Sequence, residues 1–575
     1  MRRSLLTALV TLACLLGMAA SASAHAVLES SAPARGAELK VAPDRVDFRF
    51  NEPVEASLGA VRVFNTDGEE VQSDGPERPG ASTEAIGVEL PADLPDGLYT
   101  ATYRVVSADA HPISGGITFT VGKPGKDQSA FVQSRSISDL LAENETGTVT
   151  EVGFWFVRLI GYLAIALAVG GIVWMLFVLG REPSVPAGSD REVAARFQRL
   201  MLPVAATGLL VSLLAIIFQG AVGAGTSFQD AFGSGIPRQV IDTRYGTMML
   251  VRAEAWVVIL GLVIWAGGQF RRPGAVSFIG LLAATVLVVT PSLAGHASTR
   301  DPGWLLIPSD IVHVAAMAVW AGGLAAMLWI LPAATRQLKD PTIRTSLLTG
   351  TATRFSGIAL VSVALIGVSG AVQAIIDVGS VGDLLSTQFG RAVLIKIVLF
   401  ALLVGLGAAN RMRIIPALVR RQERAESPGG PGNRLRQLLR VEVVTVVAVL
   451  GVTAALVSYP PPDAITSGPA SGSVQAGPNR LDYTVDPAKV GRNEVHLYVF
   501  DDQSGAPVPV ISVDVSFSLP DREIAPIEAD VRRAGGGHFI VPSAMLGVKG
   551  DWQATVAMRL SRFDEPTATF KVEIE

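Results

Sequence analysis

The sequence predicts a mixed fold in which two soluble β-sandwiches flank a bundle of eight transmembrane helices. Hydrophobic residues make up 49% of the chain, charged residues only 17%, and the mean hydropathy is +0.43. The apolar residues concentrate between 151 and 460, in runs near the ~20 residues that a helix needs to cross a bilayer. Outside this region, short runs alternate apolar with polar residues between Gly and Pro, which is typical of antiparallel β-sandwiches.

Eight apolar runs, rich in Leu, Val, Ala and Gly, are predicted to span the membrane. They cover residues 154–180, 201–223, 248–269, 274–294, 305–332, 355–377, 392–410 and 441–458. Most basic loop residues follow the first, third, fifth and seventh of these runs. The alternate loops hold only Arg238, Arg244, Arg300 and Arg391. The positive-inside rule therefore predicts a multi-pass protein of the cell membrane with both termini outside the cytoplasm.

Two soluble domains are predicted on either side of the membrane part. Residues 25–123 carry the alternation of a cupredoxin-like or Ig-like sandwich, for example at Val46, Phe48 and Phe50. Residues 481–575 resume this alternation and predict a second, Ig-like sandwich. Polar or Gly/Ser/Pro-rich linkers, residues 124–150 and 461–480, separate these domains from the membrane domain, residues 151–460.

The first 24 residues have the pattern of a signal peptide. Arg2 and Arg3 precede an apolar stretch, and Ala22-Ser23-Ala24 predicts cleavage after Ala24. The only cysteine, Cys14, lies inside the apolar stretch and is expected to be discarded with it. The mature chain would then have neither disulfides nor thiolate metal ligands.

Cleavage after Ala24 would make His25 the first residue of the mature chain. Its α-amino group and ring Nδ1 could then chelate one metal ion, an arrangement that suits tetragonal Cu(II). Asp109 and His111 lie two residues apart downstream, and in an extended segment this spacing puts both side chains on one face. The sequence therefore predicts a copper site in the N-terminal domain.

Several motifs resemble those of known copper proteins. The CopC family is matched by the sequence that begins His-Ala-Val-Leu-Glu at His25, by Phe-Asn-Glu-Pro-Val-Glu at residues 50–55, and by Ser-Ala-Asp-Ala-His-Pro-Ile-Ser-Gly at residues 107–115. The membrane part resembles CopD in residues 294–297, 310–323 and 390–396, and the segment around Gly550-Asp551-Trp552 resembles a YtkA-type domain. This order is similar to that of YcnJ-like CopC–CopD fusions.

The resemblance implies a ligand set for Cu(II) in the N-terminal domain. The implied ligands are His25, Asp109, His111 and, as in some members, the acidic residue Glu52. Other members carry a methionine-rich Cu(I) loop, but no methionine lies between residues 25 and 150 here. We therefore expect one Cu(II) ion and weak retention of Cu(I), which favours soft thioether ligands.

A second metal site is predicted within the membrane. His296 lies at the outer end of the fourth predicted helix, and His313 lies in the fifth. Asp310, His313, Met317 and Trp320 share one helix face, because they are spaced i, i+3, i+7 and i+10. We expect His296, His313 and Met317 to bind copper, as Cu(I), and Asp310 to orient an imidazole.

Other polar residues fall in the predicted helices, mostly in the outer half. They are Arg158, Gln219, Glu254, Gln373 and Lys396, with Glu442 near the cytoplasmic end of the last helix. Ionisable groups at membrane depth usually face a bundle interior or a pathway. The structural alternative is that Arg158 and Lys396 snorkel to the membrane surface. In this alternative, Glu254 pairs with Arg252, and Glu442 pairs with Arg440.

These features favour copper acquisition, in which the N-terminal domain captures Cu(II) and the membrane domain transports copper inward. Copper resistance or homeostasis is the close alternative. A haem-binding membrane protein and a brace-type copper oxidase are less favoured, and no enzymatic activity is expected. The sequence shows no Walker-type ATP-binding motif and no basic patch for nucleic acid. The expected partners are copper ions, the lipid bilayer, and an extracytoplasmic copper chaperone or reductase.

The C-terminal domain contains two histidines, His496 and His538, which are distant in sequence and have no cysteine beside them. Two interpretations stay open. Either both imidazoles are structural, or this domain accepts or passes copper at the outer mouth of the membrane domain, aided by the high effective concentration that tethering gives.

Overall fold

The structure is a computed structural model of the 575-residue chain. It describes residue 26 and residues 28–34, 37–65, 68–73, 75–107, 112–122, 146–182, 190–266, 270–298, 302–336, 338–378, 380–459, 470–502, 508–535 and 537–574. The chain divides into two compact units, one of which holds the long helices. The other holds both β-sandwiches together with residues 220–239.

The N-terminal domain is a sandwich of two sheets, as predicted. One sheet has the strand order β1-β3-β5 and the other the order β2-β7-β6-β4. The strands are β1 (Leu28–Ala32), β2 (Ala37–Leu39), β3 (Arg45–Phe50), β4 (Val54–Phe64), β5 (Ala85–Glu89), β6 (Gly97–Ser107) and β7 (Pro112–Val121). Phe48 and Phe50 of β3 pack on Tyr103 of β6, with ring centroids 4.9 and 5.3 Å apart, and this aromatic cluster joins the two sheets.

The C-terminal domain is a second, larger sandwich. Its sheets have the orders β13-β14-β10-β9-β8 and β12-β11-β15-β16. The strands are β8 (Ala470–Ala476), β9 (Asn479–Asp486), β10 (Gly491–Asp501), β11 (Ser512–Leu519), β12 (Ile524–Ala529), β13 (Arg532–Gly535), β14 (His538–Leu546), β15 (Gly550–Arg559) and β16 (Thr567–Ile574). The alternating residues expected to face inward, such as Leu497, Phe517 and Trp552, are buried in its core.

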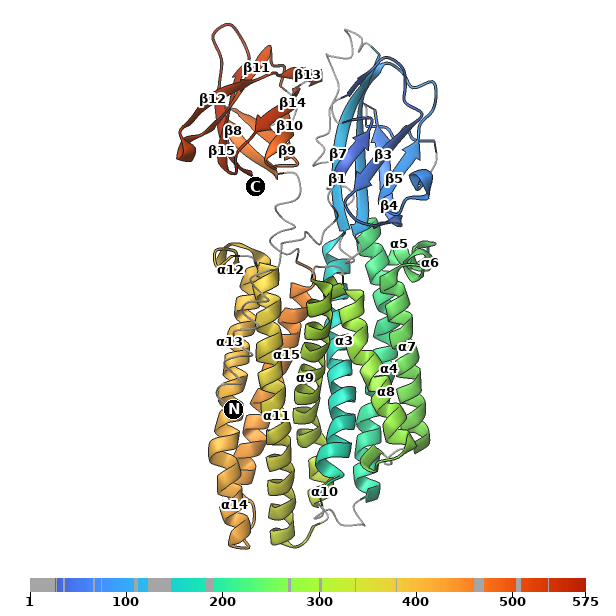
Figure 1. The fold of residues 1–575 in the computed structure, drawn as a ribbon, viewed down its shortest axis with the longest axis vertical. Coiled ribbons are helices and arrows are strands. Elements are labelled where there is room, and N and C mark those ends of the chain that lie inside the picture. The colour runs from blue at the N-terminus through green and yellow to red at the C-terminus, as the bar shows by residue number, and fades with distance from the viewer. Residues whose placement is uncertain are drawn as a thin grey trace. The chain divides into compact units, whose positions relative to one another are not determined.

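Among the described residues, eight helices are long and apolar enough to cross a membrane, which confirms the predicted number. They are drawn alongside one another in Figure 1. Their principal segments are α3 (Thr148–Val173), α4 (Asp190–Ala224), α7 (Arg244–Ala266), α8 (Ala275–Ala294), α9 (Gly303–Trp329), α11 (Pro341–Val378), α13 (Gln388–Ala409) and α15 (Gly429–Leu456). Several extend beyond the predicted apolar runs, since polar flanking turns continue the helix. Helix α13, for example, continues through a π-helical turn, Asn410–Ile414, into α14 (Ile415–Glu423).

Helices α3 and α9 approach each other closely through two glycines. A Cβ atom added to Gly170 would lie 2.5 Å from both the Ala318 carbonyl oxygen and the Gly322 Cα. A Cβ atom added to Gly322 would clash with the Ala166 carbonyl oxygen. Small residues at a contact let the backbones of two membrane helices approach closely, and the helices gain dispersion energy from this approach. This contact therefore fixes the position of α9, the helix that carries His313.

We expect Gly322→Ala to destabilise the membrane domain, because the added methyl group would clash with backbone atoms, which cannot move aside as a flexible side chain does. Overpacking of this kind costs about 1–3 kcal/mol. A lower thermal unfolding midpoint of the detergent-solubilised protein would report the effect. Gly405→Ala on α13 is the matched control, because nothing lies within 4 Å of its added Cβ. Equal midpoints for the two variants would contradict the glycine contact.

Candidate functional site

Three segments that carry the predicted copper ligands of the N-terminal domain converge through strand pairing. Leu28 of β1 pairs with Phe50 of β3. Val54, the first residue of β4, pairs with Ser107, the last residue of β6. Val106 in turn pairs with Pro112 at the start of β7. The described residues that flank positions 25, 52 and 108–111 therefore lie at one end of the sandwich. His25, Asp109 and His111 themselves lie outside the described residues.

Glu52 lies in the short loop between β3 and β4. The Phe50 N–H donates a hydrogen bond to the Glu84 carbonyl oxygen at 2.8 Å, and the Val54 N–H donates one to the Thr83 carbonyl oxygen at 2.9 Å. These bonds fasten both ends of the loop to the chain that leads into β5. The Glu52 side chain is half-buried. A carboxylate in a loop fixed at both ends can be offered to an ion with little loss of conformational entropy.

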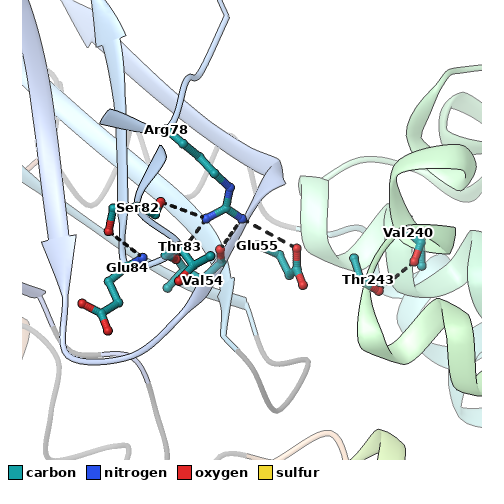
Figure 2. Close-up of polar contacts among 8 residues, drawn as sticks. All are labelled: Val54, Glu55, Arg78, Ser82, Thr83, Glu84, Val240 and Thr243. Atoms are coloured by element: carbon teal, nitrogen blue, oxygen red, sulfur yellow. Dashed lines mark hydrogen bonds and ion pairs between the residues drawn. The ribbon is translucent and has the colours of Figure 1, made fainter. Parts of the chain in front are cut away.

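Arg78 braces the same loop, as Figure 2 shows. Its guanidinium donates hydrogen bonds to the carbonyl oxygens of Val54 at 2.8 Å and Thr83 at 3.0 Å, and lies 3.9 Å from the Glu55 carboxylate. Burial raises the pKa of the Glu55 carboxyl, and the positive charge of Arg78 opposes this rise. Arg78 is a residue that the sequence did not single out, because its partners are mostly backbone carbonyls.

The predicted membrane site centres on His313 of α9. Its Nδ1 lies 3.0 Å from the Ser369 Oγ of α11. That hydroxyl donates its own hydrogen to the Leu365 carbonyl oxygen at 2.6 Å, so it accepts a hydrogen bond from Nδ1–H. The lone pair of the imidazole is then on Nε2, which is the arrangement of a metal-binding histidine. Gly370 lets the α11 backbone approach the ring, since a Cβ there would lie 3.3 Å from Cε1 of His313.

Asp310 and Met317 lie on the same helix as His313, at the predicted spacings. Asp310 lies beside Ser292 of α8 and within electrostatic reach of Lys396 of α13. The Nδ1 of His313 thus faces a serine rather than Asp310. Met317 is partly buried against the apolar core of the helices. His296 begins a short 3₁₀ turn, His296–Ser298, directly after α8, and its side chain lies outside the described residues.

Further polar side chains surround this face of α9. Lys396 is within electrostatic reach of Asp377 as well as Asp310. The Arg252 Nε donates a hydrogen bond to the Thr290 Oγ1 at 2.9 Å, so Arg252 has a partner other than Glu254, whose side chain is exposed. Tyr162 of α3 interacts electrostatically with both Arg252 and Asp310. The sequence did not single out Tyr162, because one tyrosine in an apolar helix carries no periodic signal.

Two more of the predicted polar residues have buried side-chain atoms. Gln373 lies one helical turn after Ser369, and its buried Nε2 has no hydrogen-bond partner among the residues that the structure describes. Glu442 of α15 accepts a hydrogen bond from the Asn410 Nδ2 at 2.7 Å, so its partner is Asn410 rather than Arg440. Asn410 opens the π-helical turn after α13, and such turns are frequent at functional sites.

The C-terminal domain brings its two histidines together. Tyr498 of β10 is opposite His538 of β14 in the antiparallel register, which places His496, two residues away, on the same face. The Nδ1 of His496 lies 3.1 Å from the Nε2 of His538, although the residues are 42 positions apart in the chain. Nowhere in the described part of the chain are three or more His, Cys, Asp and Glu side chains already arranged around one point as for a metal ion.

Comparisons with known proteins cover most of this architecture. Residues 28–122 match the CopC domain, residues 149–307 match the N-terminal domain of copper resistance protein D-like proteins, and residues 349–456 match copper resistance protein D. Copper transport protein CutJ of Bacillus subtilis is 28% identical to the chain over 563 residues, or 95% of each protein. The chain therefore joins CopC and CopD domains in one polypeptide.

Relatives of the separate parts support this assignment. Copper resistance protein C of Escherichia coli is 32% identical over 120 residues, which are 20% of this chain and 94% of that protein. Copper resistance protein D of Pseudomonas syringae pv. tomato is 28% identical over 280 residues, which are 48% of this chain and 88% of that protein. The domain assignment and the eight apolar helices make the chain a multi-pass membrane protein that handles copper.

We expect Arg78→Ala to loosen the β3–β4 loop, because three backbone carbonyl oxygens, those of Val54, Ser82 and Thr83, each lose a hydrogen bond from the guanidinium. A hydrogen bond to a charged group contributes about 1.5–3 kcal/mol. In hydrogen–deuterium exchange of the full-length protein, residues 50–55 of the variant should exchange at least roughly tenfold faster than those of the wild type. Arg49→Ala is the matched control, since its guanidinium makes a 3.5 Å contact with Glu84 at the surface. Unchanged protection in Arg78→Ala would mean that the loop is held by the strands alone.

Proposed function

We propose that the protein acquires copper, with the N-terminal sandwich capturing Cu(II) and the membrane domain carrying copper inward. The observation that carries this proposal is the half-buried imidazole of His313, whose Nε2 lone pair is left available by the hydrogen bond to Ser369. A histidine inside an apolar bundle is costly unless it has a task or a partner. Met317 follows one turn later, and a thioether with an imidazole suits Cu(I).

The N-terminal site proposed here consists of His25, Asp109, His111 and Glu52. Its support in the structure is the convergence of the strands that flank these positions, and the fixed loop of Glu52. The His25 part of the proposal needs cleavage after Ala24, which frees the α-amino group. It also needs this domain and the C-terminal domain to be extracytoplasmic, as the distribution of basic loop residues predicts.

Transfer from this site to the membrane site requires a change of ligands. Nitrogen and carboxylate ligands favour Cu(II), whereas His313 and Met317, with His296, favour Cu(I). We therefore propose that copper is reduced between capture and passage, and that an extracytoplasmic reductase or chaperone supplies the electron or the reduced ion. Two half-buried charged residues, Asp310 on α9 and Lys396 on α13, would keep the face hydrated or charge-balanced when the ion enters.

Copper resistance is the second candidate, because two relatives are named for resistance and CutJ for transport. The two functions predict opposite changes in cellular copper. A deletion strain should contain less copper than the wild type at limiting copper if the protein imports it. Normal content at limiting copper with increased content at excess copper would instead support resistance.

We expect a blocked N-terminus to weaken Cu(II) binding strongly. One alanine placed before His25, so that the mature chain begins one residue earlier, turns the amine ligand into an amide and removes a chelate ring. Titration of the purified full-length protein with Cu(II) should then lose its tightest site, with electron paramagnetic resonance following the tetragonal signal. Glu29→Ala, an exposed carboxylate of β1, is the control that should leave the site intact. Equal affinity of the extended and native proteins would exclude the brace.

We expect His313→Ala to reduce copper uptake by the complemented deletion strain to the level of the empty vector, while the Cu(II) affinity of the N-terminal site stays unchanged. The reason is that the two sites lie in separate parts of the fold. Val312→Ala is the matched control, because its exposed side chain precedes His313 on another face of α9. Membrane insertion is checked by immunoblot. Wild-type uptake by an inserted His313→Ala protein would make this histidine structural.

A further inference from the structure

The outward face of strand β10 carries polar residues that are nonetheless buried. Val495, Leu497 and Val499 point into the core of the C-terminal sandwich. Glu494, His496 and Tyr498 alternate with them and are therefore on the opposite face. His496 and His538 are each only 2% exposed. Burial of polar side chains is expensive unless their hydrogen bonds are made or they serve a function.

The contact with Glu494 determines which ring nitrogen of His496 faces a carboxylate. The Glu494 carboxylate lies 2.8 Å from His496 Nε2, and accepts its hydrogen. The lone pair of His496 is therefore on Nδ1, which faces the Nε2 of His538 at 3.1 Å. A carboxylate behind one ring nitrogen, with the other nitrogen presenting a lone pair, is the usual arrangement around metal-binding histidines.

His538 has one nitrogen that this arrangement does not satisfy. Its buried Nδ1 has no hydrogen-bond partner among the described residues. Burial, and secondarily the neighbouring His496, lowers the pKa of His538 well below its ordinary value. A neutral imidazole is the form that binds metals. Tyr498 stacks on it with ring centroids 4.2 Å apart and holds the plane of the ring.

We propose that His496 Nδ1 and His538 Nε2 bind one Cu(II) ion in the C-terminal sandwich. Two nitrogens 3.1 Å apart, each ~2.0 Å from an ion, subtend an angle of roughly 100°, which suits adjacent positions of a tetragonal or tetrahedral site. The ion replaces the hydrogen now shared between the rings, and His538 then carries its hydrogen on Nδ1. The choice of copper among imidazole-binding ions rests on the proposed function.

Glu494 has a positioning role in this site. Its carboxylate faces the nitrogen of His496 that is remote from the ion, so it orients the ring and raises its basicity without binding copper itself. The nearby methionines do not suggest a Cu(I) site, because Met558 lies in the core and Met545 is exposed. The site thus offers nitrogen ligands, like the predicted N-terminal site, and fits a second point at which Cu(II) is held.

The chain allows a direct test, because it contains six histidines. Substitution of His25, His111, His296 and His313 by Ala, in full-length protein purified without a histidine tag, leaves His496 and His538 as the remaining imidazoles. Titration with CuSO₄ in a glycine-buffered solution should show one bound Cu(II) per chain, with imidazole nitrogen modulation in pulsed electron paramagnetic resonance. Further substitution of His496 or His538 by Ala should remove that modulation or weaken binding at least ~10-fold.

Two further variants separate a copper site from a structural histidine pair. Glu528→Gln, which changes an exposed carboxylate of β12, should bind copper normally, whereas Glu494→Gln should weaken binding about 10- to 100-fold. Hydrogen–deuterium exchange of β10 and β14 checks that the sandwich is folded in each variant. If the fourfold variant does not fold, the comparison is made in the otherwise native chain, where His538→Ala should lose one Cu(II) and Glu528→Gln none.

A folded protein that binds Cu(II) without imidazole modulation, or equally well with and without His496 and His538, would overturn the proposal. This test is independent of transport. If His496 and His538 do not bind copper, uptake through His313 is unaffected. Loss of uptake in the fourfold variant, in turn, does not alter copper binding at His496 and His538.

Discussion

The membrane domain depends on one constraint, which is that helix α9 must be apolar and close-packed on one side and polar on another. Gly170 and Gly322 bring α3 and α9 together at backbone distance. This contact leaves the other faces of α9 for α8, α11 and α13, which supply Ser292, Ser369 and Lys396. Polar groups in a bilayer must find partners inside the protein, and here the neighbouring helices supply them.

The two sandwiches bring distant parts of the chain together through strand pairing. In the N-terminal domain, the pairing of β1 with β3 and of β4 with β6 gathers separate segments at one end, and Arg78 holds the intervening loop. In the C-terminal domain, the pairing of β10 with β14 gathers two imidazoles on one face. In the C-terminal domain, the regular hydrogen bonding of the sheet thus positions two side chains that are distant in the sequence.

The chemistry proposed for the three sites follows their ligand types. Nitrogen and carboxylate ligands in the sandwiches favour Cu(II), and the imidazole–thioether pair of α9 favours Cu(I). A chain with these properties would hold copper outside the membrane in one oxidation state and pass it in the other. The change of oxidation state would then act as a selection step, because ions that cannot be reduced would remain at the nitrogen sites.

Periodicity alone was sufficient to predict much of the fold. Apolar runs near bilayer length predicted all eight helices, and alternation at Val46, Phe48 and Phe50 predicted a strand of the first sandwich. Helix ends were predicted less well, since polar turns such as those of α14 continue a helix without any apolar signal. The spacing of Asp310, His313 and Met317 indicated a polar face on one helix. The partner Ser369 was not predictable, because it comes from α11, 56 positions away.

The sequence by itself determined the order of the domains, the number of helices and the residue types available for copper. Only the tertiary structure decided which of those residues meet. Sequence reasoning left His496 and His538 as two distant imidazoles with either a structural or a functional role. The antiparallel register of β10 and β14 places their nitrogens 3.1 Å apart, with Glu494 behind one ring. The physical reason is that strand register is set by the burial of whole sheet faces, a cooperative property of all the strands that no local pattern contains.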